Sequence, residues 1–267
     1  MGSAATKPKT KPETMIVDSS HVDVPVAASA MRVHVHAPAG ASATRRFPGL
    51  VLYSEIYQQT EPIRRAAVRL AGHGYVVAVP EVFHEHEPPG TVLPYDPVGT
   101  DTGNRYKYDT SLRSFDAGVR AVTALLRDDA RVTRRLGAIG WCLGGHLAFR
   151  AAFLPEVLAT ACFYPTDIHD DTLGLGKASD SKARAGEIRG EVALIFGRQD
   201  PHVPPEGRRA IYDALTASNV SFSWHEFNAI HAFMRDEGPR YDPALTTLGF
   251  SLALEMFDRV LKATEGE

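Results

Sequence analysis

Short runs of apolar residues alternate along this chain with segments in which apolar side chains recur every three or four positions. Runs of the first kind are typical of buried β-strands, and the second spacing gives a helix one apolar face. The pattern predicts strands at 22–26, 31–36, 49–53, 75–79, 136–141, 157–164, 192–196 and 221–227. It predicts helices at 62–72, 110–127, 145–153, 205–218 and 243–262.

Strands that alternate with helices indicate an α/β fold, because each crossover helix returns the chain to form the next strand parallel to the last. The first two strands, 22–26 and 31–36, are expected to form an opening antiparallel pair. We therefore expect a mainly parallel sheet with helices on both faces. In such a sheet, the functional groups lie in loops at the carboxyl ends of the strands.

Two long segments interrupt this alternation. Residues 83–108 are rich in Pro, Gly and Asp and are expected to be irregular, and residues 166–188 form a polar excursion. Loops of this length inside a compact domain are usually functional. We expect the excursion at 166–188 to cap a pocket.

The composition narrows the class of protein. The chain has 267 residues, of which 44% are hydrophobic, and this predicts one α/β domain over 14–267 behind a disordered tail at 1–13. A net charge of −3 without a basic stripe argues against a nucleic-acid partner, and no apolar run is long enough to span a membrane. Two cysteines make no disulfide framework, so a cytoplasmic location is expected.

The most informative stretch is Gly-Trp-Cys-Leu-Gly-Gly at 140–145. It has the G-x-nucleophile-x-G pattern of a sharp strand-to-helix turn, with Cys142 at the position of the nucleophile. A strand is predicted before it and a helix after it, as the motif requires. So sharp a turn leaves no room for Cβ atoms two residues either side of the nucleophile, and it strains the nucleophile's backbone. The first N–H groups of the helix would favour a thiolate.

A thiol nucleophile needs a base and a group that orients the base, and in this fold class the chain order is nucleophile, acid, His. Asp200 follows the predicted strand 192–196, and His231 follows the predicted strand 221–227. Asp200 would hold the imidazole tautomer, and His231 would carry protons between thiol, leaving group and water.

Each of these residues also has a structural interpretation. Cys142 could be a buried cysteine before a helix, Asp200 a turn residue before a proline, and His231 a loop histidine. The three residues occur in the required order, each just beyond a predicted strand, and this favours a catalytic triad.

Further motifs carry a resemblance to a known family. The run at 140–145, Gly-Arg-Gln-Asp-Pro-His at 197–202, His-Ala-Phe-Met-Arg at 231–235 and Tyr-Ser-Glu-Ile-Tyr at 53–57 resemble the dienelactone hydrolase family. The resemblance covers about 31–261. It implies a cofactor-free α/β-hydrolase fold with a triad of Cys142, Asp200 and His231. The activity that names the family is hydrolysis of dienelactone to maleylacetate.

The resemblance also implies a role for Glu55. In the family this residue contacts the resting thiol and takes its proton when substrate binds. The alternative is a strand-end carboxylate paired with Arg64 or Arg65. The N–H groups of Ile56 and Leu143 would then form the oxyanion hole.

Substrate binding is the next role that the resemblance implies. An arginine at the position of Arg235 binds the substrate carboxylate in the family, with a second arginine from the long loop, for which Arg105 is the best candidate. Tyr57 is placed with these substrate-binding residues. Arg235 could equally belong to a solvated run of charges with Asp236 and Glu237.

Histidines raise a metal-site alternative. His84 and His86 lie in the long loop, and His169 and His202 lie in later loops. No cysteine joins them at a zinc spacing, and hydrolases of this kind need no metal, so we expect neither metal nor cofactor. The two long segments depart from the family pattern where substrate selectivity would be set.

The leading hypothesis is a Cys–Asp–His hydrolase that cleaves a small activated ester or lactone, bearing a carboxylate, through an acyl-thioester intermediate. One alternative is a broader carboxylesterase or thioesterase without a carboxylate requirement. Another is a binding protein of hydrolase fold whose triad is very slow.

Overall fold

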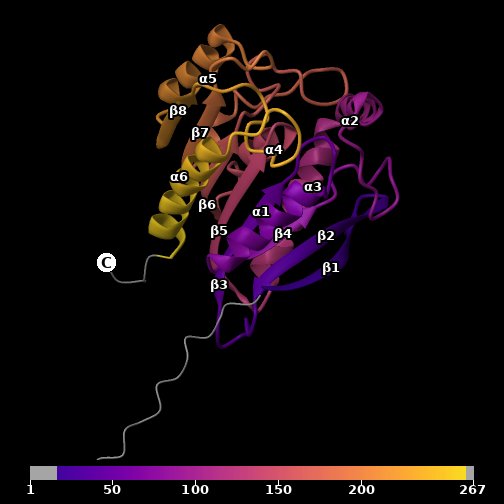
Figure 1. The fold of residues 1–267 in the computed structure, drawn as a ribbon. Coiled ribbons are helices and arrows are strands. Elements are labelled where there is room, and N and C mark those ends of the chain that lie inside the picture. The colour runs from indigo at the N-terminus through magenta and orange to yellow at the C-terminus, as the bar shows by residue number, and fades with distance from the viewer. Residues whose placement is uncertain (1–16, 263–267) are drawn as a thin grey trace, which may run out of the picture.

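The computed structural model describes residues 17–262. The tail predicted at 1–13 lies outside these residues. One eight-stranded sheet runs through the molecule in the order β1-β2-β4-β3-β5-β6-β7-β8 (Figure 1). The strands are β1 Val17–Val26, β2 Ser29–Pro38, β3 Phe47–Tyr53, β4 Val76–Pro80, β5 Val132–Trp141, β6 Val157–Phe163, β7 Glu191–Gly197 and β8 Phe222–Phe227. The helices are α1 Glu61–Gly72, α2 Pro97–Asp109, α3 Leu112–Asp128, α4 Leu143–Ala151, α5 Pro205–Ala217 and α6 Pro243–Leu261.

The sheet is mainly parallel, which confirms the predicted fold class. Strand β2 pairs antiparallel with β1 and β4, and the remaining neighbours pair parallel. The carboxyl ends of β3, β5, β6, β7 and β8 therefore meet at one edge of the sheet, where a site can be assembled from several loops.

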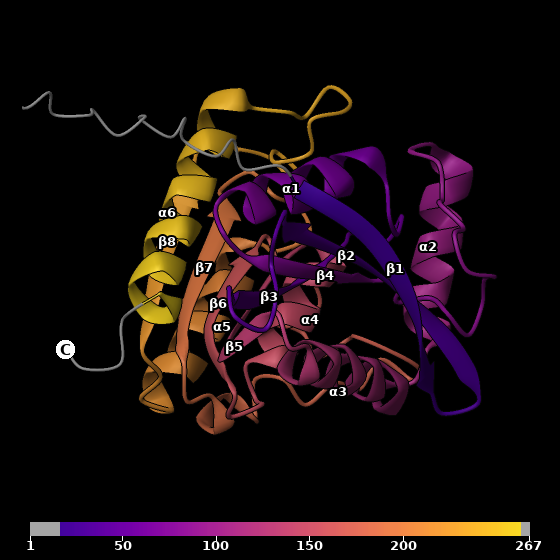
Figure 2. The ribbon, with the colours of Figure 1, turned by 90° about the horizontal axis from the view of Figure 1, so that it is seen from below.

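Two hydrophobic cores flank the sheet. Successive residues of β3 face opposite ways, so that Val51 joins one core while Leu50 and Leu52 join the other. Helices α3, α4 and α5 pack on the first face, and α1 and α6 pack on the second (Figure 2). In the described part of the chain, no helix is long and apolar enough to cross a membrane.

The segment 83–108 is less irregular than the sequence predicts, because α2 occupies its second half. Asp96 caps this helix by accepting a hydrogen bond from the Gly99 N–H at 2.8 Å, and Pro97 is its first residue. Both are local signals of a helix start. The expectation of an irregular segment is wrong here because α2 has little apolar periodicity and contains two glycines, Gly99 and Gly103.

The excursion at 166–188 contains one short 3₁₀ turn, Ala185–Glu187, and is fastened to α4 by buried polar side chains. The His146 Nδ1–H donates to the Thr166 carbonyl at 2.8 Å, and His146 Nε2 accepts from the Ser181 hydroxyl at 2.7 Å. The buried guanidinium of Arg150 binds Asp180 and the same hydroxyl, at 2.7 and 2.8 Å. The excursion is thus an ordered part of the domain.

Acid should weaken the fold through His146. Burial lowers the pKa of this imidazole to about 3, whereas an unfolded chain titrates histidine near ~6.5. The contribution of His146 to stability is therefore complete above about pH 6.5 and is lost as the pH falls towards 3, because only the unfolded state takes up the proton. We expect this group to reduce the free energy of unfolding by about 1.4 kcal/mol per pH unit within that window.

Urea unfolding at several pH values measures this slope. His146→Gln should reduce the slope by that amount, and His73→Gln, at an exposed position, should leave it unchanged. Equal slopes in the wild type and His146→Gln would contradict the prediction.

Candidate active site

The turn from β5 into α4 places Cys142 at the carboxyl edge of the sheet. Cys142 has φ 58° and ψ −120°, a conformation that costs a residue with a Cβ atom on the order of 1–3 kcal/mol. A Cβ on Gly140 would overlap the Gly144 carbonyl, and one on Gly144 would overlap the carbonyl oxygens of Tyr53 and Ser54. The glycines of the motif are therefore required by close backbone contacts.

Asp200 and His231 lie just beyond the ends of β7 and β8, and both are buried. The His231 Nδ1–H donates to Asp200 Oδ2 at 2.7 Å, and Asp200 Oδ1 accepts from the His202 N–H at 2.8 Å. The bond to Asp200 selects the tautomer that leaves Nε2 free to accept a proton.

The electrostatics of His231 depend on Cys142. Burial disfavours the charged imidazole, but the Cys142 thiolate and the hydrogen bonds of Asp200 and Cys142 outweigh burial and raise the pKa of His231 to about 10. Cys142 and Asp200 together therefore favour the imidazolium form of His231.

Two backbone donors flank Cys142. Within residues 17–262, the N–H groups of Ile56 and Leu143 find no protein acceptor. Leu143 is the first residue of α4, and Ile56 follows β3, the strand next to β5. Gly103 of α2 packs against Ile56 so closely that a Cβ would lie 2.5 Å from the Ile56 carbonyl oxygen. Helix α2 therefore holds this loop against the site.

Glu55 is buried beside Arg235. Its Oε2 lies 3.8 Å from Arg235 Nη1 and has no hydrogen-bond partner in the described chain. Burial raises the pKa of Glu55, and the opposing charges of Arg235 and His231 do not cancel this effect. The alternative pairing with Arg64 or Arg65 is wrong. Arg64 binds Glu61 at 2.9 Å, and Arg65 binds Asp236 at 2.7 Å.

Aromatic rings hold the Arg235 side chain. Its guanidinium lies 4.2 Å from the Tyr95 ring centroid and 5.7 Å from that of Tyr57. The two rings meet edge to face at 4.6 Å. Arg235 is largely buried, so it is not part of a solvated run of charges.

One cavity of about 860 Å³ unites most of these groups. The predicted site residues that line it are Cys142, His231, Glu55, Ile56, Tyr57 and Arg235. Arg105 is not among its lining residues. It is exposed, and its guanidinium lies 4.9 Å from the Tyr106 ring centroid. The structure therefore does not bring Arg105 to the site.

Lys107, two residues further along α2, lines the cavity instead. Its ammonium lies 3.0 and 3.1 Å from the two Asp167 carboxylate oxygens, and both side chains are buried. Arg240 is a further lining cation. Sequence reasoning missed this pair because its members are 60 residues apart. The Asp96-Pro97 helix start was the local signal that could have placed Lys107 on a helix.

The histidines do not form a metal centre. His84 hydrogen-bonds Ser29 and His86 hydrogen-bonds Thr110, whereas His169 and His202 line the cavity. The described residues hold no group of three or more His, Cys, Asp or Glu side chains placed to bind a metal ion. His169 also shows that the excursion at 166–188 forms part of the cavity wall, with Thr166, Asp167 and Asp170.

Comparison with known proteins identifies the family. Residues 31–261 match the sequence profile of the dienelactone hydrolase family. The chain belongs to this family. A Saccharomyces cerevisiae protein provisionally named a carboxymethylenebutenolidase is 41% identical over 95% of this chain and 96% of its own length. The carboxymethylenebutenolidase of Pseudomonas sp. strain P51 is 27% identical over 82% of this chain and 87% of its own.

A solved structure agrees at the level of the fold. The crystal structure of a Klebsiella pneumoniae protein, provisionally assigned as a dienelactone hydrolase, has a TM-score of 0.75 and 22% identity. It covers 91% of this chain and 99% of its own. The predicted family and the predicted α/β-hydrolase fold are confirmed. This dienelactone hydrolase family member is a carboxylic ester hydrolase of the carboxymethylenebutenolidase kind.

The sharp turn from β5 into α4 predicts that alanine destabilises the protein far more at one glycine than at another. Gly144→Ala should lower the free energy of unfolding by at least about 3 kcal/mol, because the new Cβ meets backbone carbonyls that cannot move without displacing β3. Gly72→Ala, in α1, should stay within about 1 kcal/mol of the wild type, because nothing lies within 4 Å of its Cβ. Chemical denaturation compares the two. Similar losses in both variants would show that the contact at Gly144 is not restrictive.

Proposed function

We propose that this protein hydrolyses small activated esters or lactones that carry a carboxylate, through a thioester on Cys142. The observation that carries the proposal is the shared cavity, in which Cys142 and the Asp200-bound His231 face the same space as Arg235. A nucleophile, a base and an anion-binding group thus surround one position for substrate.

Acylation begins with the thiolate. Glu55 is the proposed acceptor of the thiol proton, because its carboxyl is buried and its raised pKa makes it a stronger base than a solvated carboxylate. The thiolate attacks the ester carbonyl, and the oxyanion accepts hydrogen bonds from the Ile56 and Leu143 N–H groups. The carbon–oxygen bond to the leaving group then breaks as His231 donates its proton to the departing oxygen, which leaves the imidazole neutral.

Deacylation uses the same base. Neutral His231 takes a proton from water as the water oxygen attacks the thioester carbonyl. The carbon–sulfur bond breaks, the acid leaves, and the thiolate is restored beside the imidazolium. Glu55 then returns the thiol proton to the sulfur. Asp200 stabilises the imidazolium in this step through the 2.7 Å bond to Nδ1.

Arg235 is the proposed binding group for the substrate carboxylate. The Arg235 Nε–H donates to the Glu237 carbonyl at 3.2 Å, but Nη1 is 3.8 Å from Glu55, too far for a hydrogen bond, so the Nη groups can bind a second carboxylate. A relative named carboxymethylenebutenolidase supports a carboxylated lactone as the substrate class. Lys107 and the wall at 166–188 lie on the same cavity and would tune which substrates fit.

Arg235→Ala should change selectivity. We expect kcat/KM for a carboxylated activated ester to fall about ten- to 150-fold, since a hydrogen bond to a charged group contributes about 1.5–3 kcal/mol. A neutral ester of the same leaving group should change little. Steady-state kinetics gives the ratio of kcat/KM for the carboxylated ester to kcat/KM for the neutral ester. This ratio is insensitive to losses common to both substrates.

Two further variants make the result decisive. Arg105→Ala removes a cation that does not line the cavity and should leave the ratio as it is in the wild type. Cys142→Ala should abolish turnover of both esters. Turnover that survives in Cys142→Ala would disprove the nucleophile, and an unchanged ratio in Arg235→Ala would disprove the carboxylate site and favour a broader esterase.

A further inference from the structure

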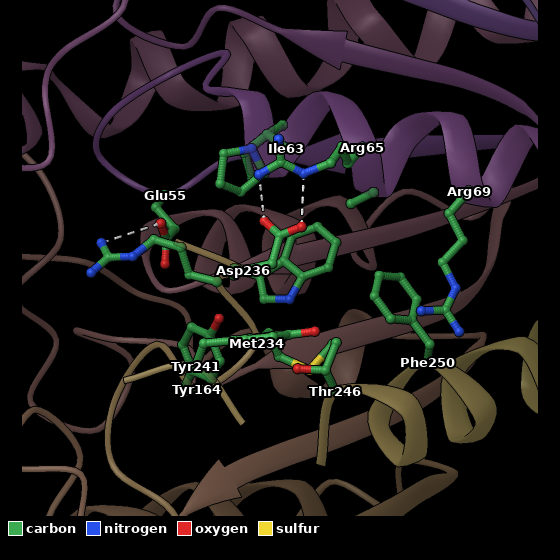
Figure 3. Close-up of a pocket in the computed structure, with 14 residues that line it drawn as sticks. Glu55, Ile63, Arg65, Arg69, Tyr164, Met234, Asp236, Tyr241, Thr246 and Phe250 are labelled. Atoms are coloured by element: carbon green, nitrogen blue, oxygen red, sulfur yellow. Dashed lines mark hydrogen bonds and ion pairs between the residues drawn. The ribbon is translucent and has the colours of Figure 1, made fainter. Parts of the chain in front are cut away.

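A second, smaller cavity of about 110 Å³ lies behind the Glu55–Arg235 pair (Figure 3). The two cavities share Glu55 and Arg235 as a common wall, and neither Cys142 nor His231 lines the small one. It lies between α1 and the start of α6, beyond the carboxyl ends of β5 and β6. The small cavity has no role in the reaction proposed for the large cavity.

The walls of the small cavity are mostly apolar. Its lining includes Trp141, Met234, Phe250 and Ile63. The Arg69 guanidinium covers the outer face of the Phe250 ring at 4.2 Å. Figure 3 shows the Arg65–Asp236 ion pair at one side of the cavity, with bonds of 2.7 and 2.8 Å. Such walls favour the flat apolar face of a ligand over bulk water.

Three buried polar atoms belong to residues that line this cavity and lack a hydrogen-bond partner in the described chain. They are Trp141 Nε1, the Tyr164 hydroxyl and Glu55 Oε2. Their residues are at most 4% exposed. An unpaired buried polar atom is costly, so three at one cavity indicate a missing partner.

The chemistry of these atoms specifies the partner. The Trp141 N–H can only donate, the Tyr164 hydroxyl can donate, and an ionised Glu55 oxygen can only accept. A hydroxyl group has two lone pairs and one hydrogen, and so matches two donors and one acceptor. A volume of about 110 Å³ is comparable to the roughly 150 Å³ apolar cavity that holds one benzene ring in an engineered protein.

We propose that the small cavity is a binding site for a small hydroxylated ring compound of the phenol class. The ring would lie among Trp141, Met234 and Phe250, and the hydroxyl would pair with unpartnered atoms of this set, the Trp141 N–H among them. Arg65 and Tyr241 line the cavity and are partly exposed, which gives the ligand a route in from solvent. Glu55 would then contact ligands in both cavities.

The test uses phenol and toluene as matched probes, because they share a ring and differ in the hydroxyl. Titration of the Cys142→Ala protein, followed by ligand-observed NMR, separates this site from any turnover in the large cavity. We expect phenol to bind with a millimolar Kd and toluene at least about tenfold more weakly, a difference of about 1.4 kcal/mol.

Variants locate the binding. Ala66→Phe adds a ring to a residue that lines only the small cavity and should abolish phenol binding. Val68→Phe adds the same ring on the same helix outside both linings and should leave binding intact. Trp141→Phe keeps an aromatic wall but loses the donor, and should reduce the preference for phenol over toluene even if Ala66→Phe fails to fold.

Three results would overturn the proposal. Equal affinity for phenol and toluene would remove the role of the hydroxyl. Phenol binding that survives in folded Ala66→Phe would place the ligand elsewhere. No phenol binding at tens of millimolar would show that the small cavity is not a site for phenols. None of these results depends on whether Cys142 hydrolyses an ester, so this proposal and the proposed function can fail separately.

Discussion

The contact between the backbones of Gly140, Gly144 and Tyr53 is the constraint on which the rest of the site depends. It brings the backbones of the end of β3, the end of β5 and the start of α4 into van der Waals contact, with no side chain between them. Cys142 is consequently strained and projects above the sheet edge. The same contact sets the N–H groups of Leu143 and Ile56 on neighbouring segments, so one backbone junction positions both Cys142 and these two N–H groups.

Around that junction, buried charges occur in pairs. Asp200 with His231, Glu55 with Arg235, and Lys107 with Asp167 each combine a carboxylate with a cation at or beside the cavity. Burial of a single charge would be very unfavourable, and the pairing offsets much of that cost. The Glu55–Arg235 pair is the loosest of the three at 3.8 Å, and it is also the pair that separates the two cavities. A ligand on either side could therefore reach one of its members without breaking a hydrogen bond between them.

Much of the wall of the large cavity comes from the two segments that interrupt the regular alternation of strands and helices. Helix α2 contributes Lys107 and packs Gly103 against the loop of Ile56. The excursion at 166–188 contributes Asp167 and His169 and is attached to α4 through His146 and Arg150. The elements of the sheet thus hold Cys142 and His231, and the inserted segments shape the cavity beside them. Under the proposed function, selectivity could change in these segments without moving Cys142.

Local patterns in the sequence determined the fold class, the positions of most helices and strands, and the residues of the sharp turn at 140–145. Apolar periodicity reports burial directly, and the spacing of glycines around Cys142 reports the backbone conformation that the turn demands. The positions of Cys142, Asp200 and His231 after three predicted strands placed all of them at one edge of the sheet, because parallel strands end there. Only the tertiary structure decided that Lys107 and not Arg105 faces the cavity, that Glu55 is buried against Arg235, and that a second cavity lies between α1 and α6. These features depend on contacts between residues 60 to 180 positions apart, and no short-range pattern encodes which distant side chains share a buried space.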